Sequence, residues 1–213
     1  MKTIITIGRE FGSGGHVIGK LLSEKLGIPF YDKELLDRAA KDSGFCKEIF
    51  ENQDERPTTS FLYSLVMDTY SSNIMNDMPL NQKVFLAQFD SIKKIAREGA
   101  CVIIGRCADY ALEEDPNVLS VFIHAELDDR VKRISNLYDL TPNKARDRIR
   151  KNDKSRSSYY NYYTSKEWGA AESYDLSVNS SKYGIEGTVN LLIQAIEIKE
   201  KGTAEKIYNV PEN

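Results

Sequence analysis

The sequence predicts a single α/β domain in which helices cover both faces of a parallel β-sheet. Short β-branched or apolar runs, typical of buried parallel strands, alternate along the 213 residues with stretches of helical periodicity. A glycine-rich loop from Gly8 to His16 separates the first such run from the first helical stretch. Alternation of this kind predicts a sheet whose ligand binds at the carboxyl ends of the strands.

The first strand and the first helix are defined by their ends. Residues 3–7 are rich in β-branched side chains and end at Gly8, as expected of a buried strand. From Val17 onward, apolar residues recur at helical spacing until Gly27, a residue favoured at the C-terminal end of a helix. These signals predict a strand, a loop and a helix in direct succession.

The next elements lead into a segment of weak periodicity. Residues 28–31 predict a second short strand, and Asp32 can cap a helix that continues to about Gly44. Residues 45–80 contain two prolines and scattered aromatic and methionine side chains. We interpret this segment as a helical insertion that covers a site.

The second half of the chain returns to alternation. An amphipathic helix is predicted from Asn81 to Gly99, and the apolar run 100–104 that follows predicts the next buried strand. Residues 118–123 predict another strand, and residues 127–137 a charged helix. The sheet is therefore expected to gain two more strands here.

The last elements include an unusually polar helix. Thr141 followed by Pro142 is a strong helix start, because a cap residue precedes proline at the first helical position. This helix is rich in lysine and arginine and makes up most of a polar segment over residues 138–172. Residues 176–178 predict a final strand, and residues 185–198 a closing amphipathic helix.

Composition excludes several classes of protein. The net charge of −3 argues against a general nucleic-acid-binding protein, which needs a basic surface. The three cysteines form no CxxC pair and there are two histidines, so neither a disulfide framework nor a zinc site is expected. No signal-peptide core is found, nor any run near the roughly 18 apolar residues of a membrane span, so we expect a cytoplasmic protein with no membrane partner.

The glycine-rich loop has the setting of a phosphate-binding loop. Glycines let successive backbone N–H groups turn toward an anion, and the helix that follows adds the positive end of its dipole. A plain tight turn is the alternative, but the strand before the loop and the helix after it favour phosphate binding. The predicted phosphate-binding residues are Gly8, Arg9, Phe11, Gly12, Ser13, Gly14, Gly15 and His16.

The loop departs from the GxxxxGK[ST] pattern of P-loops. If Gly14 is the last glycine of that pattern, Arg9 takes the place of the first glycine, Gly15 that of the lysine and His16 that of the serine or threonine. Arg9 could supply the missing positive charge, and Ser13 a hydroxyl group. The alternatives are that Arg9 and Glu10 form a surface ion pair and that His16 only begins the helix.

Several separated motifs, in order along the chain, carry a family resemblance. They are residues 9–15, 30–36 and 103–106 with Asp109, followed by Asp153, Lys154, Arg156, Tyr159, Tyr160, Trp168 and residues 174–176. On these motifs the chain resembles the cytidylate kinase-like family, which is similar to the bacterial cytidylate kinases among the P-loop nucleoside monophosphate kinases. The resemblance implies a three-layer P-loop NTPase-type fold with an acceptor-site insertion and a lid.

The resemblance also implies an acceptor site. In cytidylate kinases the second strand ends in an aspartate, and an arginine six residues later holds the acceptor monophosphate; Asp32 and Arg38 reproduce that spacing. Arg106 matches another arginine that contacts the acceptor nucleotide, and the nearby aspartate is displaced to Asp109. The family's acidic residue at the end of this strand falls on Ile104, so no carboxylate for Mg²⁺ is visible there.

Lid cations complete the predicted site. Phosphoryl transfer spreads negative charge over the equatorial oxygens, and cations stabilise it. The resemblance implies that a basic lid supplies them, and we select Arg148, Lys154 and Arg156, with Arg9, as catalytic residues. A solvated helix face is the alternative for these charges.

These residues predict a kinase that transfers the γ-phosphoryl group of ATP, bound with Mg²⁺, to a nucleoside monophosphate such as CMP. Two alternatives remain open. One is a non-catalytic nucleotide-binding regulatory protein, because the P-loop lysine, the hydroxyl group after it and the strand carboxylate are absent. The other is a kinase with a different small-molecule acceptor.

Overall fold

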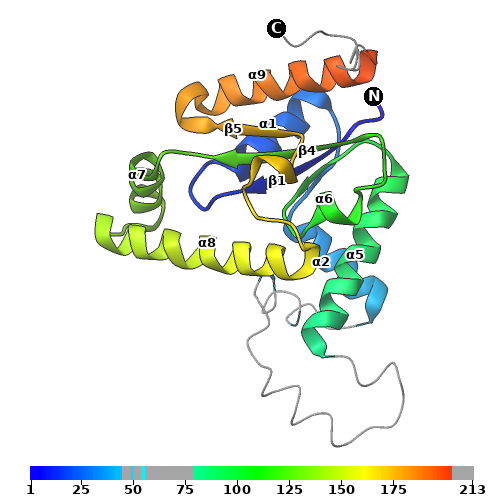
Figure 1. The fold of residues 1–213 in the computed structure, drawn as a ribbon, viewed down its shortest axis with the longest axis horizontal. Helices are drawn as coiled ribbons and strands as arrows, with labels where there is room; N and C mark the ends of the chain where they lie inside the picture. The colour runs from blue at the N-terminus through cyan, green and yellow to red at the C-terminus, as the bar shows by residue number, and fades with distance from the viewer. Residues whose placement is uncertain (45–48, 50–53, 56–78, 203–213) are drawn as a thin grey trace, which may run out of the picture.

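Five parallel strands form the centre of the computed structural model, which describes residues 1–44, 49, 54–55 and 79–202. The strands lie in the order β2-β3-β1-β4-β5, with β1 in the middle (Figure 1). In the register of the sheet, Ile7 of β1 lies between Ile104 of β3 and Val121 of β4. The strand bounds are β1 Ile4–Arg9, β2 Phe30–Tyr31, β3 Val102–Ile104, β4 Val118–His124 and β5 Leu176–Asn179.

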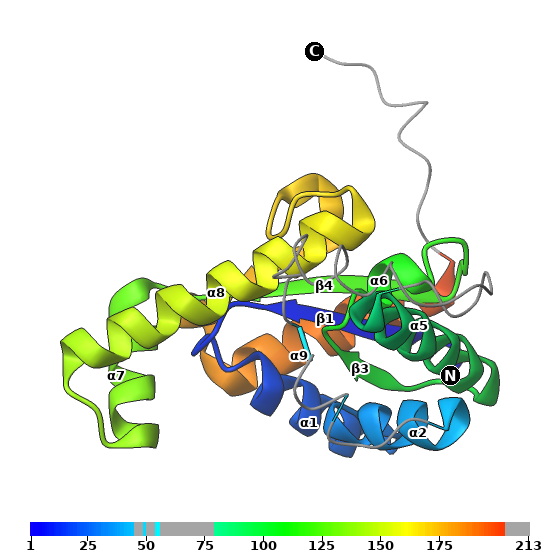
Figure 2. The ribbon, with the colours of Figure 1, turned by 90° about the horizontal axis from the view of Figure 1, so that it is seen from below.

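Helices cover both faces of the sheet, as the alternating pattern predicts. Figure 2 shows α1 and α9 on one face and α8 on the other. The helices are α1 Gly15–Leu26, α2 Lys33–Ser43, α5 Leu80–Glu98, α6 Ala108–Ala111, α7 Leu127–Tyr138, α8 Pro142–Thr164 and α9 Ser180–Lys201, with a 3₁₀ turn at Ala171–Ser173. The predicted three-layer α/β fold, with helices on both faces of a parallel sheet (Figure 2), is therefore confirmed.

Alternate residues of β1 define the two halves of the core. Ile5 and Ile7 are fully buried among side chains of α1 and α9, including Leu22 and Leu192. Ile4 points to the opposite face, where it packs with side chains of α2, α5 and α6. The β-branched run is buried on both sides, as in parallel sheets that are covered by helices.

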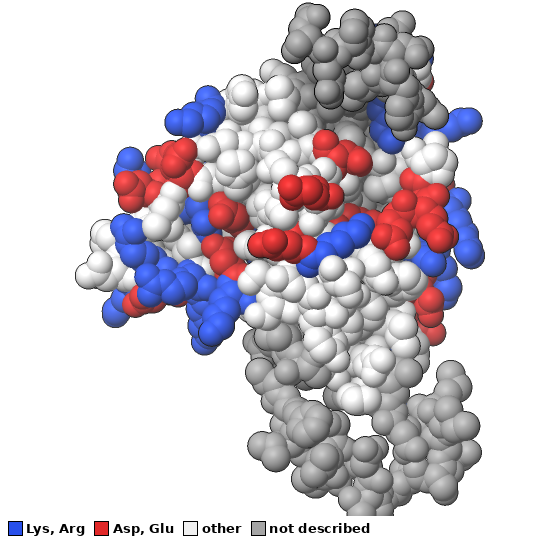
Figure 3. Space-filling view, in the orientation of Figure 1, with Lys and Arg blue, Asp and Glu red and all other residues white. Residues whose placement is uncertain are grey.

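A third apolar cluster joins α8 to the carboxyl half of the sheet. Phe122 of β4 packs against Tyr159 and Tyr160 of α8 and against Tyr174. The polar helix is thus anchored by its C-terminal turns. Its first turns lie beside α7, where Figure 3 shows Lys and Arg side chains gathered on the surface.

Some boundaries and details differ from prediction. Asp32 occupies the N-cap position of α2, but its side chain makes no capping hydrogen bond, so the predicted cap is wrong. Its carboxylate binds Arg106 and His16 instead. The last helix begins at Ser180 rather than 185 and bends at Gly184, whose φ is +66°.

The predicted insertion at 45–80 lies mostly outside the described residues. Within the described part of the chain, no helix is both long enough and apolar enough to span a membrane.

Candidate functional site

Two glycines of the glycine-rich loop, which lies between β1 and α1, adopt a left-handed backbone conformation. Gly12 and Gly14 both have φ of +86°, a backbone conformation that disfavours side chains. The fully buried Ser13 accepts a hydrogen bond from the Gly15 N–H at 3.4 Å, so its hydroxyl faces the start of α1. His16 lies in the first turn of α1, in agreement with a helix-start residue, and its Nδ1 lies 2.9 Å from Asp32.

The Arg9 side chain occupies the space that the Cβ of a P-loop lysine at residue 15 would need. A Cβ atom added to Gly15 would lie 2.7 Å from the Cβ of Arg9, closer than side-chain atoms approach. A Cβ on Gly105, just after β3, would lie 2.2 Å from Arg9 Nη1. The Arg9 side chain therefore runs from the loop across to the end of β3.

Arg9 ends at a buried carboxylate, that of Glu55. Arg9 Nη1 donates to Glu55 Oε1, and Arg156 Nε of α8 donates to Oε2 at 3.1 Å. The backbone N–H of Arg106 donates to Oε1 at 3.2 Å. Burial alone would raise the pKa of Glu55, but Arg9 and Arg156 hold that pKa well below its usual value. Arg9 and Glu10 do not pair with each other, so the surface ion pair considered for them is wrong.

Arg106 lies at the carboxyl end of β3 with its guanidinium buried. Its Nε and Nη2 donate to the two oxygens of Asp54 at 2.9 and 2.8 Å, and Nη1 donates to Asp32 at 2.9 Å and to the Ile104 carbonyl at 3.0 Å. Burial raises the pKa of Asp54. Burial would also raise the pKa of Asp32, but the combined attraction of Arg106, Arg9 and His16 outweighs it and lowers the pKa. The structure thus brings together Asp32 and Arg106, two of the predicted acceptor residues.

A second ionic cluster fastens the loop to α7 and α8. The backbone N–H of Phe11 donates to Asp153 Oδ1 at 2.8 Å, and Arg130 pairs with the other oxygen of Asp153. Arg130 also donates to the Phe11 carbonyl at 2.9 Å and pairs with Glu10 at 3.0 Å. A loop amide of the kind expected to bind phosphate is therefore bound to a carboxylate of α8. Sequence reasoning missed Arg130, although Asp153 stands out as an acid among the basic residues of its helix.

The fourth predicted acceptor residue, Asp109, is buried and bound to α8. Tyr160 donates a hydrogen bond of 2.6 Å to its carboxylate, and burial raises its pKa. Asp109 lines a cavity of about 20 Å³ with Gly8, Glu55, Tyr159 and other residues of the site. Most of the space at the strand ends is thus filled by the protein's own side chains.

Three predicted residues lie away from this cluster. Arg38 is bound to Glu98 at the end of α5, with Nη1 2.9 Å from Oε2. Glu98 precedes β3, whereas the site follows it, and six helical residues advance about 9 Å along the axis. Arg148 is exposed with its guanidinium 3.7 Å from the centre of the Tyr138 ring, and Lys154 is exposed. Of the three predicted lid cations, Arg156 alone reaches the site.

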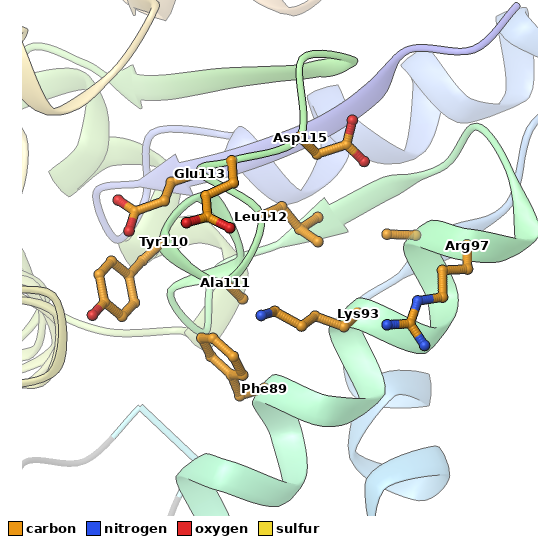
Figure 4. A pocket seen from close by; sticks show the side chains of 10 residues that line it. Phe89, Lys93, Arg97, Tyr110, Ala111, Leu112, Glu113 and Asp115 are labelled. Atoms are coloured by element: carbon orange, nitrogen blue, oxygen red, sulfur yellow. The ribbon is translucent and has the colours of Figure 1, made fainter.

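A separate groove lies elsewhere, between α5 and α6 (Figure 4). It has a volume of about 500 Å³ and is lined by both cations and anions, among them Lys93, Arg97, Glu113 and Asp115. No residue of the glycine-rich loop and none at the carboxyl ends of β1 and β3 lines this groove. The candidate site remains the arginine cluster at the carboxyl ends of β1 and β3.

Comparison with known sequences gives consistent matches over nearly the whole chain. A sequence model described as the cytidylate kinase-like family matches residues 4–182. The cytidylate kinase of Methanococcus vannielii is 27% identical over 197 residues, which cover 91% of this chain and 99% of the relative. That of Methanobrevibacter smithii is 24% identical over 196 residues, covering 92% of this chain and 99% of the relative.

Solved structures are similar in fold. An uncharacterized protein from Eubacterium ventriosum is 31% identical, with a TM-score of 0.71, and the match covers 92% of this chain and 99% of that one. Shikimate kinase from Bacteroides thetaiotaomicron has a TM-score of 0.54 at 15% identity, over 92% of this chain and 99% of that one. At that identity the second likeness concerns the fold alone.

Proposed function

Since the chain belongs to the cytidylate kinase-like family, we propose that it is a kinase that transfers the γ-phosphoryl group of ATP to a nucleoside monophosphate such as CMP. One observation carries this proposal. Arg9 from the loop, Arg156 from α8 and the N–H of Arg106 from the end of β3 converge on a single anionic group. Two cationic side chains and one backbone N–H, from three separate segments, meet where a nucleotide-binding α/β sheet places its phosphates.

The proposed reaction needs positioning and charge neutralisation. An oxygen of the acceptor monophosphate attacks the γ-phosphorus, the bond to the β–γ bridging oxygen breaks, and ADP leaves with that electron pair. Arg9 and Arg156 are suited to stabilise the charge that spreads over the transferring group. The loop that begins α1 is suited to hold the donor phosphates.

The acceptor is expected on the β2 and β3 side of this cluster. Asp32, Arg106 and Asp109 lie there, at the strand ends. Arg106 can present its fork of N–H groups to a phosphate once Asp54 is displaced. Contact of Arg38 with the acceptor remains a prediction, and it requires Arg38 to leave Glu98.

Mg²⁺ is expected to enter as the complex of ATP. Among the described residues, no group of three or more His, Cys, Asp and Glu side chains is placed to hold a metal ion. Asp32, Asp54 and Glu55 are each paired with an arginine. Phosphate oxygens and water are therefore the expected ligands of Mg²⁺. Ser13 is the residue of the loop that carries a hydroxyl group.

A nucleotide-binding protein without kinase activity is the second candidate. It is favoured by three residues that depart from the P-loop kinase pattern: Gly15 in place of the lysine, His16 in place of the serine or threonine, and Ile104 in place of the acidic residue. A kinase with another acceptor is the third, since the segment expected to shape the acceptor pocket lies mostly outside the described residues.

An ADP-release assay across nucleoside monophosphates, shikimate and gluconate separates these candidates. We expect turnover with a pyrimidine nucleoside monophosphate, a large loss in Arg9→Ala and little change in the control Arg97→Ala, an exposed arginine of α5. Arg38→Ala and Glu98→Gln are compared for the KM of the acceptor, which rises only in the first if Arg38 binds phosphate. ATP binding without turnover of any acceptor overturns the kinase proposal.

A further inference from the structure

The carboxylate of Glu55 is enclosed by groups that bind anions. Both of its oxygens accept hydrogen bonds, Oε1 from Arg9 and the Arg106 N–H, and Oε2 from Arg156. The side chains of Arg9, Glu55 and Arg156 are only 11%, 12% and 17% exposed. The surroundings of this carboxylate are those expected of a bound phosphate.

The backbone of Glu55 adopts an unfavourable conformation, and contacts from α8 hold it there. Its φ is +48°, in the left-handed region that non-glycine residues avoid. The hydroxyl of Ser155 donates to the Glu55 carbonyl at 2.9 Å, so α8 holds both the main chain and the side chain. A strained residue that persists at such a cluster is held there by its ionic contacts.

Carboxylate and phosphate compete for the same donors. Arginine binds either group through its planar fork of N–H groups, and both ligands carry their charge on oxygens of similar spacing. A phosphoryl group cannot enter between Arg9 and Arg156 while the Glu55 carboxylate occupies that position and repels it.

We propose that Glu55 is an internal anion, which occupies the phosphoryl position between Arg9 and Arg156 in the free protein and is displaced when a nucleotide polyphosphate binds. This inference rests on the proposed function, because it takes the arginine cluster to be the phosphate site. It assigns to Glu55 a competitive role that lowers the apparent affinity for nucleotide. The same contact keeps Arg9 and Arg156 from pairing with other anions.

The opposite reading is a permanent ion bridge. If Glu55 only holds Arg9 and Arg156 in position, its loss misplaces both arginines and weakens phosphate binding. The two readings predict changes of opposite sign, so binding to one variant separates them.

The experiment is calorimetric titration of the full chain with tripolyphosphate, for the wild type and Glu55→Gln. If the internal contact is about nine-tenths populated, removing it tightens binding about tenfold. Glu186→Gln removes an exposed charge outside the site and measures the general electrostatic effect. Unchanged or weaker binding to a folded Glu55→Gln protein, or an equal gain in Glu186→Gln, overturns the proposal.

A measurement on the wild type covers the case in which Glu55→Gln does not fold. Carbodiimide-driven amidation, read by mass spectrometry, is expected to label Glu55 slowly in the free protein and several-fold faster with saturating tripolyphosphate. Exposed Glu186 is the reference. Equal labelling of Glu55 with and without tripolyphosphate would overturn the proposal. Neither readout needs turnover. If the kinase assay failed and these binding experiments gave the expected result, the proposed kinase activity would be rejected, but the competition between Glu55 and phosphate would stand.

Discussion

The side chain of Arg9 lies against the backbone of Gly15, so that a Cβ atom at position 15 would come within 2.7 Å of the Arg9 Cβ. The two positions are therefore coupled. A lysine at residue 15 and an arginine at residue 9 cannot both fit, and the loop has the arginine. We therefore expect Arg9, at the end of β1, to supply the positive charge that a P-loop places after its last glycine.

This coupling predicts that restoring the P-loop lysine alone fails. Gly15→Lys forces Arg9 out of place, and we expect a loss of about 1–3 kcal/mol in the free energy of unfolding, as in other overpacked sites. Binding of tripolyphosphate is expected to weaken. Urea denaturation and calorimetric titration measure the two effects.

The double variant Arg9→Gly with Gly15→Lys is the matched test. It removes the clash and restores a cation, so it should regain most of the stability lost in Gly15→Lys. Additive losses in the double variant would contradict the coupling.

Arg156 is expected to be the lid cation that matters most for catalysis. Its Nε binds Glu55 and its Nη1 lies 3.2 Å from the Arg9 carbonyl, whereas Arg148 and Lys154 are exposed. We expect Arg156→Ala to lower kcat/KM by about 10²–10³, the usual cost of losing one donor that stabilises transition-state charge. Steady-state kinetics measure it.

Arg156→Lys keeps the charge but loses the planar fork, and should recover only part of this activity. Arg97→Ala on α5 is the control for removal of an arginine. A loss of less than threefold in Arg156→Ala would exclude Arg156 from the transition state.

Tyr160 is expected to stabilise the fold through Asp109. Its hydroxyl donates to the buried carboxylate at 2.6 Å. Tyr160→Phe removes this donor, and a buried acceptor that loses its partner costs about 1–3 kcal/mol. Urea denaturation measures the change.

Tyr162, two residues along the same helix and 67% exposed, provides the control. Tyr162→Phe should leave the free energy of unfolding unchanged. Equal effects of the two substitutions would exclude the Asp109 hydrogen bond as the cause.

Sequence periodicity predicted the strands, the main helices and the loop because each depends on residues close together in the chain. Apolar alternation on β1 and the glycines at its end are local signals, and they predict where the site lies. Arg9 could be proposed as the replacement cation because its position in the loop is local too. The observed order of the strands and the contacts between them are consistent with these signals.

The partners of these residues could not be predicted, because they come from distant segments. Glu55 lies in a stretch without clear periodicity, and only the folded chain brings it to Arg9 and Arg156. Asp32 has the spacing of a helix cap, yet the buried guanidinium of Arg106 attracts it more strongly than the helix N–H groups do. The spacing of Asp32 and Arg38 matches the family, but the helix between them carries Arg38 to Glu98.

The cluster predicts a loss of stability at acid pH that depends on Glu55. Burial alone would raise its pKa, but Arg9 and Arg156 lower it from the ordinary value of 4.5. A carboxyl group whose pKa is lower in the folded state stabilises the fold above its ordinary pKa, and this stabilisation is lost as the pH falls through the folded-state pKa. Asp32, whose pKa is also lowered, acts in the same direction. Asp54 and Asp109 act in the opposite direction, because burial raises their pKa values.

The difference between the wild type and Glu55→Gln isolates one of these groups. Between about pH 5 and about pH 3, the free energy of unfolding of the wild type should fall more steeply, by at most about 1.4 kcal/mol per pH unit for one proton. Urea denaturation at a series of pH values measures both slopes, with Glu186→Gln, which removes an exposed acid, as the control. Parallel slopes for the wild type and Glu55→Gln would mean that Glu55 is not ionised between Arg9 and Arg156, and the competition proposed for phosphate would lose its basis.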